Sequence, residues 1–204
     1  GRGASGMRFA FPIMTDMNRW HENTILLGVT GGVAAYKAAD LASRWTQRGA
    51  VVRVRMTPSA CRFVQPLTFE AVTRQPVTTE VWQPLGTHDR PEHIGSGDDA
   101  DVFVIAPASA DHLARLAHGF GDDAVCLTVL AWDGPLVICP AMNDRMWKNP
   151  AVQANVQLLR ERGAHVVEPG VGHLACGSTG PGRLADLDVI DEQVNRILCA
   201  GELS

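Results

Sequence analysis

The segment Pro140–Trp147 (PAMNDRMW) combines side chains that could bind a small acidic molecule. It follows the apolar run 135–139, which is typical of a buried parallel strand that the proline ends. In open α/β sheets ligands bind outside the carboxyl ends of the strands, so Asn143 is expected to face such a crevice. Its carboxamide could hold a carboxylate by hydrogen bonds. Taken alone, these eight residues favour a simpler interpretation, a helix N-cap with Met142 and Met146 in the core.

Backbone amides and hydroxyl groups follow three other predicted strands. The amides of Gly31 and Gly32, with the start of the next helix, could bind one phosphate with the help of the helix dipole. Hydroxyl groups at the same edge of the sheet come from Thr30, Thr57, Ser59 and Ser109. Each hydroxyl alone is more often an ordinary N-cap. Together, three polar strand ends around one crevice favour a flavin mononucleotide.

Larger nucleotides fit the sequence less well. Residues 28–33 (GVTGGV) lack the G-x-G-x-x-G dinucleotide fingerprint, because Thr30 stands where the second glycine belongs. The second predicted strand ends in Thr57 and not in an acidic residue that could hold an adenosine ribose. The chain also has no G-K-[ST] motif. NAD and ATP are therefore both disfavoured.

The elements that must position these residues alternate along the chain. Apolar runs predict strands at residues 24–30, 51–56, 77–82, 101–106, 135–139 and 165–168. Helical periodicity and caps predict helices at 33–47, from 57, at 67–74, 109–118, 122–132, 152–162 and 187–199, with a glycine-rich loop at 170–182. This order predicts a single α/β domain, doubly wound and Rossmann-like or flavodoxin-like, around a parallel sheet of five or six strands. Residues 24–204 form that domain, and residues 1–23 are interpreted as an N-terminal extension, its first six residues as an expression remnant.

Composition narrows the class of protein. The 204 residues are 46% hydrophobic and 20% charged with a net charge of −4, which is ordinary for a globular protein and argues against a nucleic-acid partner. The apolar runs are too short for a membrane span. Five cysteines without a Cys-x-x-Cys pair exclude the usual zinc spacings and make a disulfide framework unexpected, so no metal is predicted. With no signal-peptide pattern, a cytoplasmic protein is expected.

Five blocks of the sequence resemble the FMN-dependent cysteine decarboxylases, a family that includes phosphopantothenoylcysteine decarboxylase, plant halotolerance proteins and lantibiotic peptidyl-cysteine decarboxylases. The blocks are Gly28–Lys37 (GVTGGVAAYK), His93-Ile94, Ala106–Asp111 (APASAD), Pro140–Trp147 (PAMNDRMW) and Leu174–Arg183 (LACGSTGPGR). They span nearly the whole chain. The last block matches the coenzyme A branch, the phosphopantothenoylcysteine decarboxylases.

The resemblance implies a defined reaction with FMN as cofactor. In the family the substrate's cysteinyl side chain is oxidised to a thioaldehyde, and loss of the carboxylate leaves an enethiolate. His93 matches the active-site base, Asn143 the residue that binds the carboxylate, and Cys176 the proton donor of the coenzyme A branch. A histidine suits the first role because its pKa lies near working pH. Without the neighbouring blocks, His93 would be a surface-loop histidine and Cys176 an incidental loop thiol.

The resemblance also assigns binding residues. Cofactor contacts are implied for Gly31, Gly32, Val33, Thr57, Ser59, Phe63, Ser109, Ala110, Asp111 and Ala141. Substrate contacts are implied for Met142, Asn143, Ala175 and Arg183, and residues 170–182 are expected to fold over the site as a lid. Met146 and Trp147 are interpreted as packing that holds Asn143 in place.

Substrate, assembly and extent are expectations of the same kind. The resemblance implies 4′-phosphopantothenoylcysteine as substrate and a homotrimer or dodecamer as assembly. A peptidyl-cysteine decarboxylase of a natural-product pathway and a non-catalytic flavin-binding regulatory subunit remain alternatives. Two features depart from the pattern: the polar segment 95–99 replaces a helix after His93, and the sequence ends at Ser204 without the C-terminal ligase domain of many bacterial relatives.

Overall fold

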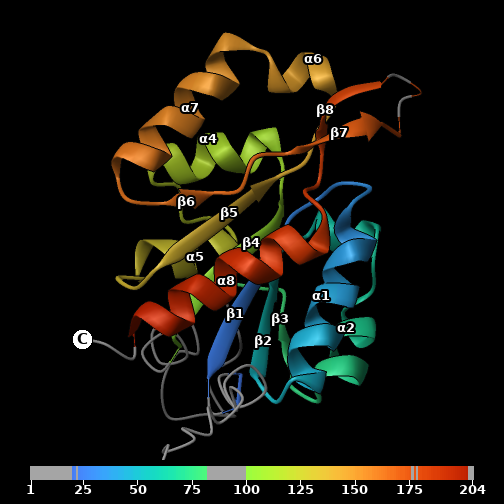
Figure 1. The fold of residues 1–204 in the computed structure, drawn as a ribbon, viewed down its shortest axis with the longest axis vertical. Helices are drawn as coiled ribbons and strands as arrows, with labels where there is room; N and C mark the ends of the chain where they lie inside the picture. The colour runs from blue at the N-terminus through green and yellow to red at the C-terminus, as the bar shows by residue number, and fades with distance from the viewer. Residues whose placement is uncertain (1–19, 22, 82–99, 176, 178, 202–204) are drawn as a thin grey trace, which may run out of the picture.

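A parallel sheet forms the centre of the molecule (Figure 1). The computed structural model describes residues 20, 21, 23–81, 100–175, 177 and 179–201. The strands lie in the order β3-β2-β1-β4-β5-β6, and every pair is parallel. Their bounds are β1 Thr24–Val29, β2 Val51–Met56, β3 Val77–Thr78, β4 Val102–Ala108, β5 Leu136–Pro140 and β6 His165–Val166. The strand order reverses between β1 and β4, which confirms the predicted doubly wound sheet and puts the ligand crevice at that point.

Helices cover both faces of the sheet, as its apolar strands require. One face packs on α1 Ala35–Gln47, α2 Pro66–Thr73 and α8 Leu187–Gly201, and the other on α4 Ala110–His118, α5 Ala124–Leu130 and α7 Pro150–Glu161. Alternate residues of one strand enter different cores: Ile25 and Leu27 join the first, and Leu26 joins the second. All seven residues of β4 are buried because this strand lies in the middle of both cores.

Short polar side chains cap the first turn of four helices. Ser109, Asp123, Asn143 and Asn149 each accept a hydrogen bond from a backbone amide in the first turn of α4, α5, α6 (Asp144–Trp147) and α7, respectively. These bonds satisfy amides that have no partner inside the helix. The N-cap interpretation of Asn143 is therefore confirmed, together with its position after β5.

Some boundaries differ from the sequence predictions. The predicted helix from Thr57 is a short 3-10 turn, η1 (Ala60–Arg62), and β3 and β6 are two residues each. Met146 was expected to be packing, but its side chain is 47% exposed, so that expectation was wrong; Trp147 is buried in the core as expected. A four-residue helix cannot direct both side chains inward, because residues 146 and 147 lie about 100° apart around its axis.

The predicted glycine-rich loop is instead an antiparallel hairpin of β7 (Gly170–His173) and β8 (Thr179–Arg183) (Figure 1). Its glycines allow close packing. A Cβ on Gly180 would lie 3.0 Å from Cβ of Asp144, and one on Gly182 would lie 2.3 Å from the carbonyl oxygen of Met142. The absence of side chains at these glycines therefore lets β8 lie against the segment that carries Asn143.

The chain that leads into β1 is anchored on α1. The ring of Trp20 stacks on that of Trp45 with centroids 6.5 Å apart, and the guanidinium of Arg48 lies 4.8 Å from the Trp20 centroid. Trp45 is fully buried, and its Nε1 donates to Asp191 of α8 at 2.7 Å. Among the described residues, no helix is long and apolar enough to cross a membrane.

Candidate active site

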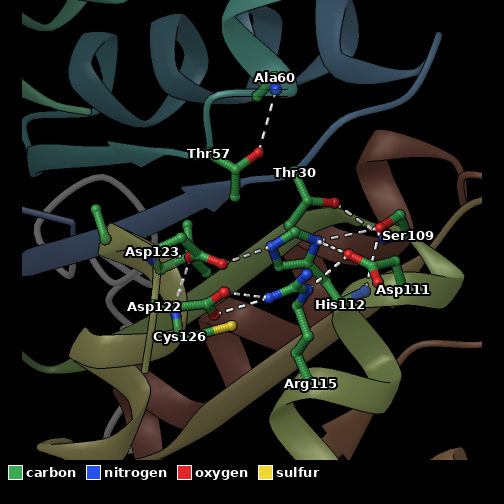
Figure 2. A network of polar contacts seen from close by, with 12 residues as sticks. Thr30, Thr57, Ala60, Ser109, Asp111, His112, Arg115, Asp122, Asp123 and Cys126 are labelled. Atoms are coloured by element: carbon green, nitrogen blue, oxygen red, sulfur yellow. Dashed lines mark hydrogen bonds and ion pairs between the residues drawn. The ribbon is translucent and has the colours of Figure 1, made fainter. Parts of the chain in front are cut away.

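The carboxyl ends of β1 and β4 are joined by the hydroxyl of Thr30. Its Oγ1 donates to the carbonyl of Pro107 at 2.7 Å and accepts from the amide of Ser109 at 2.9 Å (Figure 2). Thr30 is fully buried, so its hydroxyl is used inside the protein and does not face a ligand. The bond fixes the start of α4 against the end of β1, at the point where the strand order reverses.

The turn between β1 and α1 fits a phosphate. Within the described residues of α1, no side chain caps the N-terminus and no acidic residue stands in the first turn. A Cβ on Gly32 would meet no atom of the described residues within 4 Å, which leaves space above the turn, whereas a Cβ on Gly31 would lie 2.5 Å from Cβ of Ser59. The positive end of a 13-residue helix without a side-chain cap favours an anion there.

The residues after β2 lie beside that turn. Thr57 is buried, and its Oγ1 accepts from the amide of Ala60 at 3.1 Å, so it caps η1 (Figure 2). Ser59 contacts the Gly31 turn as described. Phe63, at the end of η1, and Val33, before α1, are 54% and 57% exposed. The predicted cofactor contacts of these residues, Val33, Thr57, Ser59 and Phe63, stay predictions. The structure brings Ser59 to the Gly31–Gly32 turn.

The block after β4 carries a surface network. Asp111 is exposed and accepts from Nε of Arg115 at 2.8 Å, and Nη1 of Arg115 reaches both carboxylate oxygens of Asp122 at 2.7 Å. The hydrogen bond from Arg115 lowers the pKa of Asp122. Asp111 is thereby held along α4, while Ser109 and Ala110 are half-buried at its start. The three predicted cofactor contacts of this block stay predictions.

Two polar residues next to this block were missed in the sequence. The imidazole of His112 lies between Ser109 Oγ, 3.2 Å from its Nδ1, and Asp123 Oδ2, 3.0 Å from its Nε2 (Figure 2). The Ser-x-x-His spacing across a helix start was a usable signal, because residues three apart share one face. Asp123 lies eleven residues further on and was recognised as a helix start alone.

The segment with Asn143 lies between β4 and β8. The amide of Ala141 donates to Ala108 at 3.0 Å, and the amide of Met142 donates to Gly182 at 2.8 Å. Oδ1 of Asn143 accepts from the amide of Arg145 at 2.7 Å. Ala141, Met142 and Asn143 are therefore brought together with the ends of β4 and β8. Their contacts with a cofactor or substrate stay predictions.

The hairpin positions the last predicted residues. Arg183 ends β8, and its guanidinium binds Asp186. Its Nε is buried beside Gly170 and Gly172 and has no hydrogen-bond partner among the residues that the structure describes. Ala175 is exposed in the β7–β8 connection, where the amide of Gly177 donates to Leu174 at 2.9 Å. His93 and Cys176 lie outside the described residues, so their catalytic roles stay predictions.

Comparison with known proteins places this geometry in a family. A family model described as Flavoprotein matches residues 15–198. A probable phosphopantothenoylcysteine decarboxylase of Streptococcus mutans is 43% identical over 179 residues, which cover 85% of this chain and 98% of the relative. The coenzyme A biosynthesis bifunctional protein CoaBC of Vibrio vulnificus is 44% identical over 162 residues, 79% of this chain and 40% of the relative. The chain thus spans about two fifths of the length of the bifunctional relatives it matches.

A solved structure agrees in fold. The FMN-dependent cysteine decarboxylase SpaF is 36% identical and superposes with a TM-score of 0.76, over 89% of this chain and 98% of that one. The likeness therefore extends over the described sheet and both helical layers. The chain belongs to the Flavoprotein family and, within it, to the group that includes the FMN-dependent cysteine decarboxylases.

Proposed function

We propose that the protein binds FMN and decarboxylates 4′-phosphopantothenoylcysteine to 4′-phosphopantetheine. The observation that carries this proposal is the position of Asn143. The residue expected to bind the substrate carboxylate lies at the end of β5, next to the β1/β4 crevice and covered by the β7–β8 hairpin. The match over nearly the full length of a probable phosphopantothenoylcysteine decarboxylase supports this substrate.

The residues present fit FMN. We assign its phosphate to the amides of Gly31 and Gly32 and of the uncapped first turn of α1. Ser59 lies against this turn, and we assign Ser109 and Ala141, which follow or end β4 and β5, to the same cofactor site. When bound, FMN supplies the reversible two-electron oxidation that lets the cysteinyl side chain accept the electrons of the carbon–carboxylate bond.

Three polar side chains have separate roles in the proposed reaction. A carboxylate is an acceptor, so it must be bound through the Nδ2 hydrogens of Asn143 while Oδ1 stays on the Arg145 amide. His93 is assigned as the base that removes the substrate proton, and Cys176 as the acid that returns a proton to the product carbon. Both assignments rest on the family resemblance.

Self-association as a homotrimer or dodecamer is part of the proposal. Exposed apolar side chains stand in the segments that follow the carboxyl ends of β1, β2 and β5 and in the hairpin: Val33, Tyr36, Phe63, Leu67, Met146 and Val171. Apolar groups at one end of a sheet favour an interface between copies. Light scattering should give a multiple of the 21.9 kDa chain mass, and Leu67→Glu, which replaces a side chain 71% exposed, should shift it toward the monomer.

The test is product analysis with purified protein loaded with FMN. Under air-free conditions, mass spectrometry should detect 4′-phosphopantetheine and carbon dioxide from phosphopantothenoylcysteine. A peptide that ends in cysteine is the parallel substrate, and its preferential turnover would replace the proposal by the peptidyl-cysteine alternative. Protein that binds FMN but releases no carbon dioxide from either substrate would favour the regulatory-subunit alternative.

A further inference from the structure

Ser109 is the first member of a chain of hydrogen-bonded side chains that continues into the protein interior. Ser109 Oγ, the His112 ring and the Asp123 carboxylate follow one another with contacts of 3.2 and 3.0 Å (Figure 2). His112 is 5% exposed and Asp123 9% exposed, whereas Ser109 is half-buried at the end of β4. The two buried polar groups therefore form a hydrogen-bonded chain that ends at the half-buried hydroxyl of Ser109.

The charge of Asp123 sets the direction of the hydrogen bonds. Its Oδ1 accepts from the amides of Val125 and Cys126, each at 2.9 Å. Burial works against the charged form, but the bonds from His112 and Cys126 lower the pKa of Asp123 to about 2. A carboxylate only accepts, so Nε2 of His112 carries a hydrogen. In the tautomer that carries its hydrogen on Nε2 alone, Nδ1 accepts, and the hydroxyl of Ser109 donates to it.

The hydrogen bonds that the Ser109 hydroxyl can still form follow from a count of its donors and acceptors. A hydroxyl has one hydrogen and two lone pairs. The hydrogen goes to Nδ1 of His112, and one lone pair accepts from the amide of His112 at 3.2 Å. One lone pair is left for a ligand. The neighbouring acid does not change this count: Asp111 Oδ2 lies 3.7 Å from Nδ1, cannot donate, and is held by Arg115.

We propose that His112 and Asp123 are a positioning pair that turns the proton of Ser109 inward, so that Ser109 offers the cofactor a lone pair and no hydrogen. The inference rests on the proposed FMN function. A phosphate dianion has no hydrogen to donate, whereas the ribityl hydroxyls and the flavin ring N–H do. Ser109 therefore binds the ribityl or flavin part of FMN, and the phosphate is left to the Gly31–Gly32 turn.

Two substitutions of His112 separate positioning from folding. Asparagine puts an acceptor near the place of Nδ1 and keeps the partner of Ser109, while glutamine puts a donor near the place of Nε2 and keeps the partner of Asp123. His112→Gln should weaken FMN binding by about 3- to 10-fold with an unfolding temperature close to that of the wild type. His112→Asn should bind FMN nearly as the wild type does but unfold earlier. If affinity simply follows stability in both variants, the positioning role is overturned.

The part of FMN that Ser109 contacts is tested with two ligands. Fluorescence titration of apoprotein with FMN and with riboflavin, which lacks the phosphate, should show the same loss of affinity for both in Ser109→Ala. A loss for FMN alone would mean that Ser109 donates to the phosphate and would overturn the proposal. The ³¹P chemical shift of bound FMN gives a second readout, which should be unchanged in Ser109→Ala even where the His112 variants fail to fold.

Two controls keep the outcomes apart. Wild-type protein that binds no flavin would overturn the proposed function, whereas flavin binding that Ser109→Ala leaves unchanged would overturn this inference alone. The second control concerns metal, because ligand atoms of His112, Asp123 and Cys126 lie within 4.8 Å of one another. One equivalent of zinc in purified protein would replace the His112–Asp123 hydrogen bond and would also overturn the proposal.

Discussion

Oδ1 of Asn143 accepts a hydrogen bond from the amide of Arg145 at 2.7 Å, so the residue assigned to the substrate carboxylate is also the N-cap of α6. The two uses are compatible because they fall on different atoms of one carboxamide. The cap also restrains the side-chain rotation, so the Nδ2 hydrogens keep a fixed direction before substrate binds. A substitution can therefore remove either use separately.

Asn143→Asp should abolish turnover while the fold is kept. Aspartate caps a helix about as well as asparagine, but it puts an acceptor and a negative charge where the substrate carboxylate must bind. We expect a loss of activity on the order of 100-fold or more, with little change in the unfolding temperature. Asn143→Ala should lose about 1 kcal/mol of stability as well, because the cap is gone. Full turnover by the aspartate variant would show that Asn143 does not bind the carboxylate.

Gly32→Ala should weaken FMN binding without a loss of stability. Within the described part of the chain, a Cβ at this position meets no atom within 4 Å, so it projects into the space assigned to the phosphate. We expect FMN affinity to fall about 10-fold or more, as for the loss of a hydrogen bond to a charged group. Gly31→Ala is the matched control: its Cβ would lie 2.5 Å from Cβ of Ser59, so affinity and stability should fall together. Unchanged FMN affinity in Gly32→Ala would show that the phosphate binds at another place.

Gly182→Ala should detach the β7–β8 hairpin from the Asn143 segment. The residue has φ of +135°, and an added Cβ would lie 2.3 Å from the carbonyl oxygen of Met142. Limited proteolysis should cut the hairpin faster, and the KM for phosphopantothenoylcysteine should rise. Gly163→Ala separates the two causes, because Gly163 has φ of +92° but no atom of the described residues would lie within 4 Å of the added Cβ. Equal effects of both variants would mean that backbone conformation, and not the contact with Met142, decides the outcome.

The stability contributed by Asp123 should disappear in acid. Its folded pKa of about 2 lies below the ordinary value of 3.8, so the unfolded chain takes up the proton first as the pH falls. The contribution is complete above about pH 5 and is lost as the pH falls through 3.8 toward 2. The difference between wild type and Asp123→Asn in urea unfolding should therefore become progressively smaller as the pH falls from about 5 to below 4. A difference that does not shrink in acid would contradict the ionised state of Asp123.

Local patterns were sufficient to predict most of the fold. The apolar runs at 24–30 and 101–106 and the helix between 33 and 47 depend on periodicity and on caps within a few residues, and these elements are present with small shifts in their ends. The hairpin at 170–183 was predicted as a loop because its glycines lack β propensity. Gly180 and Gly182 are instead required by close contacts with Asp144 and Met142, which lie 36 and 40 residues earlier in the sequence.

The sequence by itself determined the doubly wound sheet, the polar strand ends at its carboxyl edge and the family blocks, since each is a pattern of neighbouring residues. Only the tertiary structure decided how the side chains are used. Thr30 and Ser109 are 79 residues apart, yet their contact takes the Thr30 hydroxyl out of the crevice. Likewise, the direction of the Ser109 proton depends on Asp123 at the start of another helix. Hydrogen-bond direction depends on which donors and acceptors the fold brings together, and sequence spacing does not encode it.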